Sequence, residues 1–351
     1  MVYDRVNKWG GAERVLLALH EMFPEAPLYT SVYNPKTASW ASIFPKIYTS
    51  FLQKIPFVKN WHEGFGWLMP LGFESFDFSG YDLVISVTSE AAKGVITKPG
   101  TRHICYCLTP TRYLWSGYSL YFRNPILKLI SWPIVKYLQN WDKIAGQRPD
   151  TLVAISTAVK ERIEKYYNRD SKIIFPPIDS HHKNSLHANL DYYLVVSRLV
   201  PYKRVDLAVR VFNQLGRPLL VVGTGSEEWK LKLAARKNIK FLGEVSEQKL
   251  AELYAGAKAL IMPQEEEFGL VAVEAMGLGV SVIAYKKGGA LDTVVNGKTG
   301  VFFDEQTPES LALAVKKFDK GRFNPGELIH YAKKFSKERF KKEFLELVNN
   351  L

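Results

Sequence analysis

The sequence is poor in cysteine, with only Cys105 and Cys107 among 351 residues. Two thiols cannot complete the four-ligand shell of a structural zinc site. The two cysteines stand two positions apart in an apolar run, so we expect both on one face of a strand. They are interpreted as buried, reduced thiols of a cytosolic protein.

Several motifs of well-known enzyme classes are also absent. The chain has no Gly-x-Ser-x-Gly elbow, no Walker phosphate loop and no His-Glu-x-x-His pair, which removes the usual signals for serine hydrolases, P-loop enzymes and zinc proteases. An Asp-x-Asp pair, which would suit a metal-bound nucleotide sugar, is missing too. We therefore expect no metal and no other cofactor.

No apolar run is long enough to cross a bilayer. The longest candidate, Ile126 to Leu138, is interrupted by Lys128, Pro133 and Lys136. The sequence shows no signal-peptide pattern either. These absences predict a cytoplasmic protein that at most rests on the inner face of the cell membrane.

The overall composition is that of a globular protein, with 47% hydrophobic and 23% charged residues. A chain of 351 residues exceeds one ordinary core and fits two domains. The formal net charge of +12 indicates an anionic partner: a nucleotide, a nucleic acid or a phospholipid surface. Because the basic residues are dispersed and no recognised nucleic-acid module is present, we expect no nucleic acid.

Short apolar runs alternate with amphipathic patterns, which predicts βαβ units and parallel sheets. In the first half we expect strands at Leu28–Val32, Leu83–Ser86, His103–Cys107, Thr151–Ile155 and Lys172–Phe175, and helices at Glu13–Met22 and Ala158–Tyr167. In the second half we expect strands at Tyr193–Val196, Pro218–Val222, Lys240–Leu242, Ala259–Met262, Val282–Ala284 and Gly300–Phe303. Helices are expected between them, at Val205–Leu215, Glu227–Ala235, Gln248–Ala255, Leu270–Gly277 and Pro308–Phe318.

These patterns divide the chain. Residues 1–182 form an N-terminal Rossmann-like domain, residues 183–334 a C-terminal one, and residues 335–351 a tail helix. Asp179–Asn189 is polar and is expected to be the linker. Met1–Asp4 resembles the last part of a first strand, so a few upstream residues are expected to be missing. In the tail, Phe340, Phe344 and Leu347 share one side; a core-facing helix is favoured over a membrane-binding one.

The strongest functional signal is the segment from Pro263 to Met276, which follows an apolar strand and opens into a helix. Glu266 stands at the strand end and Glu274 lies about one turn inside the helix. The backbone N–H groups of Phe268, Gly269 and Leu270 are placed to receive an anion. Carboxylates accept hydrogen bonds from vicinal hydroxyls. The combination indicates a sugar that carries phosphate.

Further candidates follow other strands. Arg198 and Lys203, after Ser197, suit a diphosphate, although such a pair is often only solvated surface. Gly223 and Gly225 allow close backbone approach to a ligand or simply make a tight turn.

Other segments offer weaker signals. Val245 belongs to an apolar strand end that could hold a nucleobase. In the first domain, the glycines Gly10 and Gly11 open a helix, which makes them either an anion-tolerant loop or a flexible cap. Thr109 and Arg112 follow a strand; a surface arginine is the alternative for Arg112.

Together, three motifs resemble glycosyltransferase family 4, the retaining nucleotide-sugar enzymes with the GT-B architecture, and within it the WbaZ-like mannosyl- and rhamnosyltransferases. The motifs are Gly10-Gly11-Ala12-Glu13-Arg14, Ser197-Arg198-Leu199 with Lys203, and the Glu-x7-Glu pair Glu266 and Glu274. The resemblance covers nearly the whole chain. It implies two facing Rossmann-like domains with a cleft between them, and a tail helix that crosses back to the first domain.

The resemblance also implies roles. Arg198 and Lys203 would stabilise the departing diphosphate, Glu266 would hold hydroxyls of the transferred sugar, and Glu274 would hold the ribose. The second domain would bind the donor, GDP-mannose by resemblance. The first would bind a glycan or polyprenyl-linked acceptor, with Thr109 and Arg112 on the acceptor side. Two aromatic segments of the first half, Trp61–Met69 and Tyr121–Trp141, either rest on an anionic membrane or are ordinary core aromatics.

One position departs from the family pattern, because Leu108 stands where related sequences often carry histidine in Tyr-Cys-His-Thr-Pro. Leucine cannot donate a hydrogen bond, so another group, such as Arg112, would have to substitute. Two alternatives therefore stay open beside a transferase: a nucleotide-sugar epimerase, and a catalytically lapsed protein that binds glycan or membrane.

Overall fold

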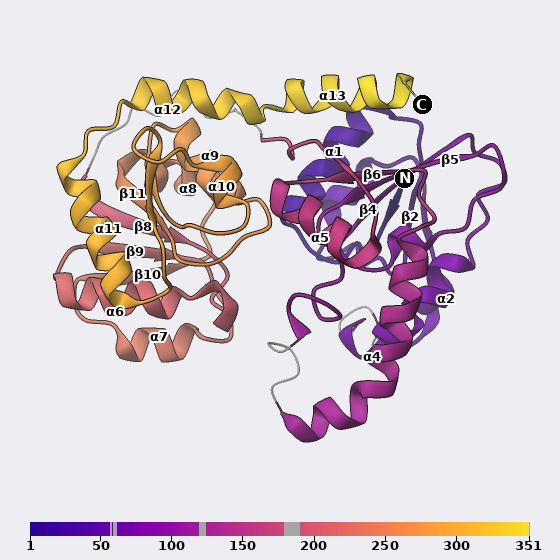
Figure 1. Cartoon of the computed structure of the whole chain (residues 1–351), viewed down its shortest axis with the longest axis horizontal. Coiled ribbons are helices and arrows are strands. Elements are labelled where there is room, and N and C mark those ends of the chain that lie inside the picture. Colours follow the sequence, from indigo (N-terminus) through magenta and orange to yellow (C-terminus); the bar gives the residue numbers. More distant parts are fainter. Residues whose placement is uncertain (57, 59–61, 119–123, 179–189, 351) are drawn as a thin grey trace. The chain divides into compact units, whose positions relative to one another are not determined.

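The computed structural model describes residues 1–56, 58, 62–118, 124–178 and 190–350 (Figure 1). It divides into two compact units. The N-terminal unit comprises Met1–Pro177 and Phe340–Leu351, and the C-terminal unit comprises Ile178–Arg339.

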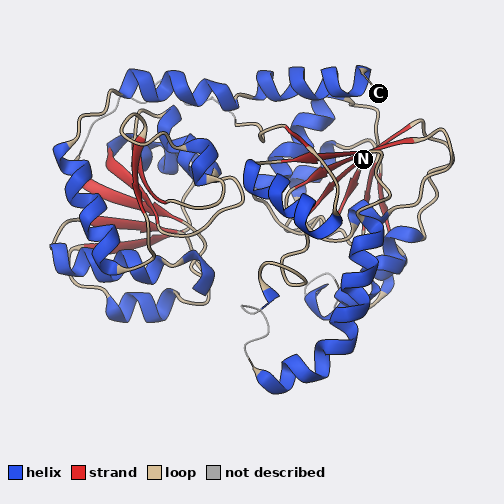
Figure 2. Ribbon diagram, in the orientation of Figure 1, coloured by secondary structure: helices blue, strands red, loops and turns tan. Residues whose placement is uncertain are grey.

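The N-terminal unit is built on a seven-stranded parallel sheet of order β3-β2-β1-β4-β5-β6-β7 (Figure 2). Its strands are β1 (Val2–Tyr3), β2 (Leu28–Thr30), β3 (Ile47–Thr49), β4 (Leu83–Thr88), β5 (Arg102–Cys107), β6 (Thr151–Ala154) and β7 (Lys172–Ile173). Its helices are α1 (Gly11–Met22), α2 (Met69–Glu74), α4 (Pro125–Ala145), α5 (Thr157–Tyr167) and, from Phe340 onward, α13 (Lys337–Asn349). Short 3₁₀ turns are η1 (Ser39–Ile43), η2 (Phe51–Lys54), η3 (His62–Leu68) and η4 (Ala92–Gly94).

The C-terminal unit is built on a six-stranded parallel sheet of order β10-β9-β8-β11-β12-β13. Its strands are β8 (Tyr192–Val196), β9 (Leu219–Val222), β10 (Ile239–Gly243), β11 (Ala257–Met262), β12 (Ser281–Tyr285) and β13 (Gly300–Phe303). Its helices are α6 (Val205–Leu215), α7 (Glu228–Ala234), α8 (Glu247–Gly256), α9 (Leu270–Gly277), α10 (Ala290–Thr293), α11 (Pro308–Lys320) and α12 (Pro325–Ala332), with 3₁₀ turns η5 (Pro201–Lys203) and η6 (Lys333–Phe335).

Helix α6 illustrates why the sequence folds this way. Val205, Ala208 and Phe212 recur at helical spacing and are all buried against the sheet. The helix stops at Gly216, whose φ of 67° is the left-handed conformation that closes a helix end. Apolar periodicity and a glycine stop therefore set both the buried face and the length of α6.

The predicted α/β class with two doubly wound, Rossmann-like domains is confirmed. Each predicted strand and helix has a counterpart within a few residues, and α6 and α9 have the predicted bounds. The sequence analysis did not identify β3, α2, α4, α10 or α12. Among the described residues, no helix is long and apolar enough to span a membrane.

The unit boundaries differ slightly from the predicted ones. The predicted limit at residue 182 lies outside the described residues, and the structure extends the C-terminal unit to Arg339. Phe335 belongs to this unit because its ring packs 5.5 Å from that of Phe268. Beyond it, Phe340 and Phe344 are fully buried against Tyr106 in the N-terminal unit. The favoured interpretation of the tail as a core-facing helix is confirmed.

Cys105 and Cys107 are free and buried on β5, as predicted. Burial raises the pKa of Cys105 to about 12 and that of Cys107 well above its ordinary value. Both thiols therefore stay protonated and unreactive.

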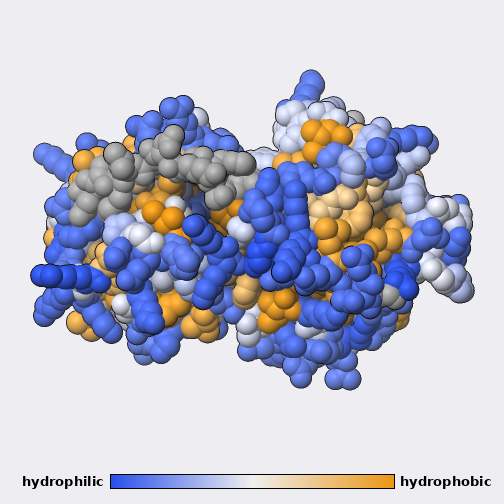
Figure 3. Space-filling model, turned by 90° about the horizontal axis from the view of Figure 1, so that it is seen from above, coloured by the Kyte–Doolittle hydropathy of each residue, from blue (hydrophilic) through white to orange (hydrophobic). Residues whose placement is uncertain are grey.

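Most of the surface is hydrophilic on the face that Figure 3 shows.

His103 gives the fold a predicted sensitivity to acid. It is fully buried on β5, where its Nε2 lies 2.8 Å from Ser86 Oγ. Burial lowers its pKa from the ordinary 6.5 to about 4. Between these values the unfolded chain binds the proton more readily, so stability falls as pH falls through this range, by about 3 kcal/mol. We expect urea unfolding to show this loss.

The control is His103→Gln, which keeps a polar group opposite Ser86 but cannot titrate. The stability difference between wild type and this variant should shrink on acidification from pH 6.5 to pH 4. A difference that stays constant over that range would contradict the assignment.

Candidate functional site

The C-terminal sheet creates a natural site between two of its strands. In the order β10-β9-β8-β11-β12-β13, the chain winds outward from β8 on one side and from β11 on the other. The loops that follow β8 and β11 therefore diverge at a topological switch point, where open parallel sheets bind ligands. Arg198 and Lys203 follow β8, and Glu266 follows β11, so the predicted site residues flank this switch point.

Lys203 and Glu266 meet directly. Lys203 Nζ lies 2.5 Å from Glu266 Oε1, and Gln264 Nε2 donates to the same oxygen at 2.7 Å. Both charged side chains are mostly buried, with 12% and 19% exposure. Gln264 is 1% exposed, and its Oε1 has no hydrogen-bond partner among the described residues. The site thus contains a paired cation and carboxylate next to an unsatisfied buried acceptor.

Arg198 is exposed and is oriented by Tyr202. Its guanidinium donates to Tyr202 Oη at 2.5 Å, and its Cζ lies 6.0 Å from the centre of that ring. Lys203 Nζ lies 5.4 Å from the same ring. One aromatic side chain therefore contacts both predicted diphosphate ligands, and two cations stand at the same loop. The sequence analysis assigned no role to Tyr202.

The glycines after β9 are required by packing. A Cβ at Gly223, where φ is 122°, would collide with the carbonyl oxygen of Ser197, and one at Gly225 would collide with that of Leu199. Leu199 N donates to Thr224 O at 2.9 Å. The loops that carry Ser197 and Gly223 are therefore locked together, which favours the tight-turn interpretation of these glycines without removing them from the site's wall.

Helix α9 starts at the switch point with its N-terminus uncapped by any side chain. Gly269, at φ 92°, is its N-cap, and Leu270 is its first residue. Gly288 and Gly289 pack so closely on this loop that a Cβ at either would collide with the backbone of Glu266 or Phe268. Gly289 N also donates to Glu266 O at 2.8 Å.

This glycine pair, which the sequence analysis missed, fixes the loop that presents Glu266. Its signal was available in the sequence as Gly-Gly shortly after the strand Val282–Ala284. A side chain at Gly288 would displace the carbonyl of Glu266, and one at Gly289 would displace the backbone of Phe268 in the same loop. Either shift would disturb the side chain beside Lys203.

Glu274 and Val245 lie further from the ion pair along the chain. Tyr254, a buried residue of α8, donates to Glu274 Oε2 at 3.1 Å and so orients this carboxylate. Val245 follows β10, the outer strand on the β9 side, and is half-buried. The structure holds Glu274 in place and puts Val245 in the loop after the sheet's edge strand.

The N-terminal sheet also has a topological switch point, between β1 and β4, but there a side chain of the chain itself occupies the backbone amides. Asp4 follows β1, is 3% exposed, and accepts hydrogen bonds from the loop after β4. The donors are the amides of Ser89, Glu90, Ala91 and Ala92, at 2.7, 3.0, 2.9 and 2.8 Å, and the hydroxyl of Thr88 at 2.8 Å. The chain's own carboxylate therefore occupies these amides, which leaves them no capacity for a phosphate.

Gly10 is the extended N-cap of α1 and Gly11 its first residue. Both are half-buried. They belong to the N-terminal unit, so their predicted position opposite Arg198 and Lys203 remains a prediction.

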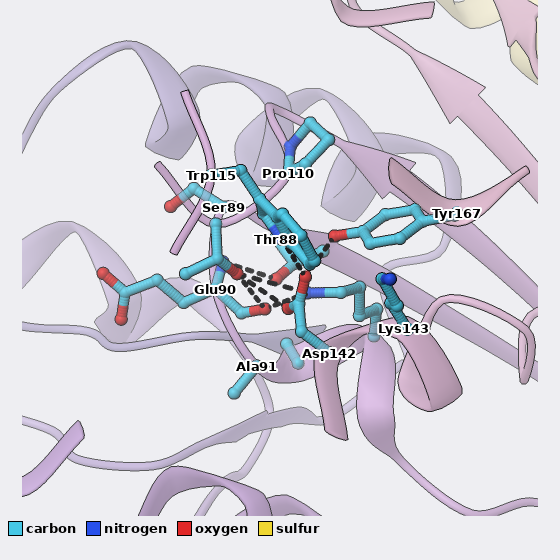
Figure 4. A network of polar contacts seen from close by, with 12 residues as sticks. Thr88, Ser89, Glu90, Ala91, Pro110, Trp115, Asp142, Lys143 and Tyr167 are labelled. Atoms are coloured by element: carbon cyan, nitrogen blue, oxygen red, sulfur yellow. Dashed lines mark hydrogen bonds and ion pairs between the residues drawn. The ribbon is translucent and has the colours of Figure 1, made fainter. Parts of the chain in front are cut away.

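The segment after β5 is anchored by a buried network (Figure 4). Thr109 and Thr111 are buried, whereas Leu108 and Arg112 are half-buried. Asp142 of α4 accepts hydrogen bonds from three side chains: Thr111 Oγ1 at 2.8 Å, Trp115 Nε1 at 2.7 Å and Tyr167 Oη at 2.8 Å. The helix thus holds the loop predicted to face the acceptor.

Lys93 completes this network. Its Nζ lies 2.6 Å from Asp142 Oδ1, and each side chain is only 1% exposed. Burial acts to lower the pKa of Lys93, but the charge and hydrogen bond of Asp142 outweigh it and raise that pKa above its ordinary value. Lys93 therefore stays protonated beside this carboxylate. Removal of one partner would leave an uncompensated charge in the core.

Residues 178–338 match the family model described as Glycosyl transferases group 1. This range coincides with the C-terminal unit, so the residues at the β8/β11 switch point lie in the matched segment. An uncharacterised glycosyltransferase of Methanocaldococcus jannaschii is 27% identical over 48% of this chain and 49% of its own length. A D-inositol 3-phosphate glycosyltransferase of Mycobacteroides abscessus is 29% identical over 47% of this chain and 41% of its own length. The chain thus spans about half the length of these curated relatives.

Solved structures match over the whole chain. Anabaena HepE in complex with UDP and glucose has a TM-score of 0.71 at 18% identity, covering 100% of this chain and 99% of HepE. The lipopolysaccharide outer core galactosyltransferase WaaB has a TM-score of 0.70 at 18% identity, with the same coverage. At this identity the likeness shows the fold, which is that of GT-B glycosyltransferases.

The buried ion pair predicts a large and specific stability effect. Asp142→Asn preserves size but leaves the Lys93 charge unpaired, so the free energy of unfolding should fall by about 3–5 kcal/mol. The control is the double variant Lys93→Met/Asp142→Leu, which removes both charges and should recover part of that loss. Urea unfolding of Lys93→Met, Asp142→Leu and the double variant measures the coupling between the two side chains. Strictly additive losses would show that the two charges do not depend on each other.

Proposed function

We propose that this chain is a retaining glycosyltransferase of family 4 that transfers a hexose from a nucleoside-diphosphate sugar to a glycan or lipid-linked acceptor in cell-surface polysaccharide synthesis. The observation that carries the proposal is the meeting of Lys203 and Glu266 at the switch point of a unit that matches group 1 glycosyltransferases. A cation beside a carboxylate suits a ligand that has both phosphate and hydroxyl groups.

In the proposed reaction, the bond between the anomeric carbon and the diphosphate oxygen breaks, and negative charge grows on the leaving diphosphate. Arg198 and Lys203 stabilise that charge, because Tyr202 already holds both cations near one place. The uncapped N-terminus of α9 adds its dipole in the same loop region. Preorganised positive groups of this kind lower the barrier without having to reorient.

The carboxylates serve the sugars. When the diphosphate engages Lys203, Glu266 gives up that ion pair and accepts hydrogen bonds from hydroxyls of the transferred sugar. Gln264 Oε1, buried and unsatisfied among the described residues, is a further acceptor for such a hydroxyl. Glu274, oriented by Tyr254, accepts from the ribose hydroxyls. Glu266 thus positions the sugar. The acceptor hydroxyl attacks the anomeric carbon on the face that the diphosphate leaves, which retains the anomeric configuration, and its proton passes to the departing phosphate oxygen.

GDP-mannose is the proposed donor, on the resemblance to WbaZ-like mannosyl- and rhamnosyltransferases. HepE, which shares the fold, was solved in complex with UDP and glucose, so a UDP-sugar is the natural comparison. The N-terminal unit would take the acceptor through the Thr109–Arg112 loop. The protein would work in the cytoplasm, peripherally bound to the inner face of the cell membrane.

Donor identity can be tested by thermal shift with a panel that includes GDP-mannose, UDP-glucose, UDP-galactose, GDP and UDP. A ligand at 100 times its Kd stabilises the fold by about 2.7 kcal/mol, so the true donor should raise Tm. We expect the largest shift with GDP-mannose, and transfer that persists with a chelator present because Arg198 and Lys203 supply the positive charge. A free epimerised product would indicate an epimerase, and binding without any turnover would indicate a lapsed protein.

The leaving-group assignment predicts the effect of removing the two cations. Arg198→Ala and Lys203→Ala should each reduce kcat by about 10²–10³-fold, and the double variant should abolish transfer while the protein stays folded. Lys230→Ala is the matched control, since the Lys230 side chain is 75% exposed on α7. Initial rates measure the effect. Turnover retained in the double variant would remove the assignment.

A further inference from the structure

Helix α4 carries an apolar stripe that faces outward. The side chains at positions 126, 129, 130, 133, 134 and 137 follow the i, i+3, i+4, i+7, i+8, i+11 spacing of one helix face. Such a stripe ordinarily packs on the core. Here Ile126, Leu129 and Ile130 are 67%, 77% and 68% exposed. We call Ile126, Leu129, Ile130, Pro133, Ile134 and Tyr137 the α4 stripe.

The core-facing side of α4 is a different set of residues. Val135, Leu138 and Ala145 are buried, and Asp142 is held in the network with Lys93. In Figure 1 the first half of α4 extends beyond the sheet of its own unit. The helix is therefore attached along one side near its end, and the stripe lies on the side that the unit does not use.

The charges around the stripe have one sign. The exposed charged residues of α4 are Lys128, Lys136 and Lys143, and its one acidic residue, Asp142, is buried and paired. On a helical wheel Lys136 and Lys143 lie together along one flank of the stripe, whereas Lys128 lies nearly opposite the stripe. Trp132, 55% exposed, lies on the same flank. Apolar side chains bordered by lysines and tryptophan match the boundary between lipid chains and anionic headgroups.

We propose that α4 lies in the plane of an anionic lipid surface, with the stripe among the acyl chains and with Lys136 and Lys143 at the phosphates. In this proposal the helix lies on the bilayer surface and does not cross the bilayer. This deepens the acceptor side of the proposed function by assigning the membrane contact to one helix. It does not depend on turnover, because lipid binding is measured without donor or acceptor.

The same helix couples the surface to the acceptor loop. Asp142 lies on α4 and accepts hydrogen bonds from Thr111 and Trp115, so the helix is tied directly to the loop after β5. Val135 and Leu138 pack with Leu114 in the same region. An acceptor carried by a lipid would therefore meet a loop whose position is set by the helix that rests on the bilayer.

The test is co-sedimentation of the full chain with vesicles of phosphatidylcholine alone and with about 30% phosphatidylglycerol. We expect binding to the anionic vesicles that weakens with salt, and little binding to neutral ones. Leu129→Ser/Ile130→Ser should weaken binding at least tenfold. Lys136→Glu should weaken it as well, and bromolipid quenching of tryptophan fluorescence should fall in Trp132→Phe.

The matched control is Leu233→Ser/Leu313→Ser, which removes two side chains of similar exposure, 67% and 66%, from the C-terminal unit. It should bind vesicles as wild type does. Thermal shift with the donor panel should be unchanged in the α4 variant, which separates failure of docking from failure of the proposed function.

Equal binding by the α4 variant, or equal binding to neutral vesicles, would overturn the proposal. Sedimentation velocity without lipid supplies the other decisive outcome. A dimer that the α4 substitutions convert to monomer would assign the stripe to a second copy of the chain instead.

Discussion

The ion pair between Lys203 and Glu266 depends on one topological constraint, the adjacency of β8 and β11 in the C-terminal sheet. The two residues are 63 positions apart in sequence and meet because the chain winds away from these strands in opposite directions. The packing of the neighbouring loops holds Lys203 and Glu266 in this position. Gly288 and Gly289 press on the loop of Glu266 from the segment after β12, and the loops after β8 and β9 lock together.

The two units differ in what lies at the switch point of their sheets. In the N-terminal unit, Asp4 fills the amides after β4 with a carboxylate from the chain itself. In the C-terminal unit, α9 begins with no side-chain cap, and two cations stand on the neighbouring loop. An anion-binding geometry occupied by an internal acid stabilises the fold, whereas the same geometry beside lysine and arginine is suited to a ligand. This contrast is the physical basis for assigning the donor to the C-terminal unit.

The sequence predicted the elements whose burial is one-sided and regular. Helix α6 has a single apolar face and a terminal glycine, so its bounds followed from periodicity. Strand β3 is three half-buried residues, Ile47–Thr49, too short for a period to show. Helix α4 contains Pro133 and has apolar residues on two faces, so its pattern resembled an interrupted apolar run. The side chains Tyr202, Gln264 and Asp142 were missed because their roles arise from contacts that no local spacing reports.

Helix α4 carries an exposed surface that needs a physical reason. A folded chain gains free energy by burying apolar side chains, so a row of them left in water at regular helical spacing forgoes that gain and marks an interaction surface. Lys136 and Lys143, on one flank of the row, would attract anionic headgroups. Since α4 also anchors the acceptor loop through Asp142, a buried charge pair and an exposed apolar row on one helix serve the same end. The first fixes the loop within the unit. In the proposed docking, the second would hold the unit against a surface that presents a lipid-linked acceptor.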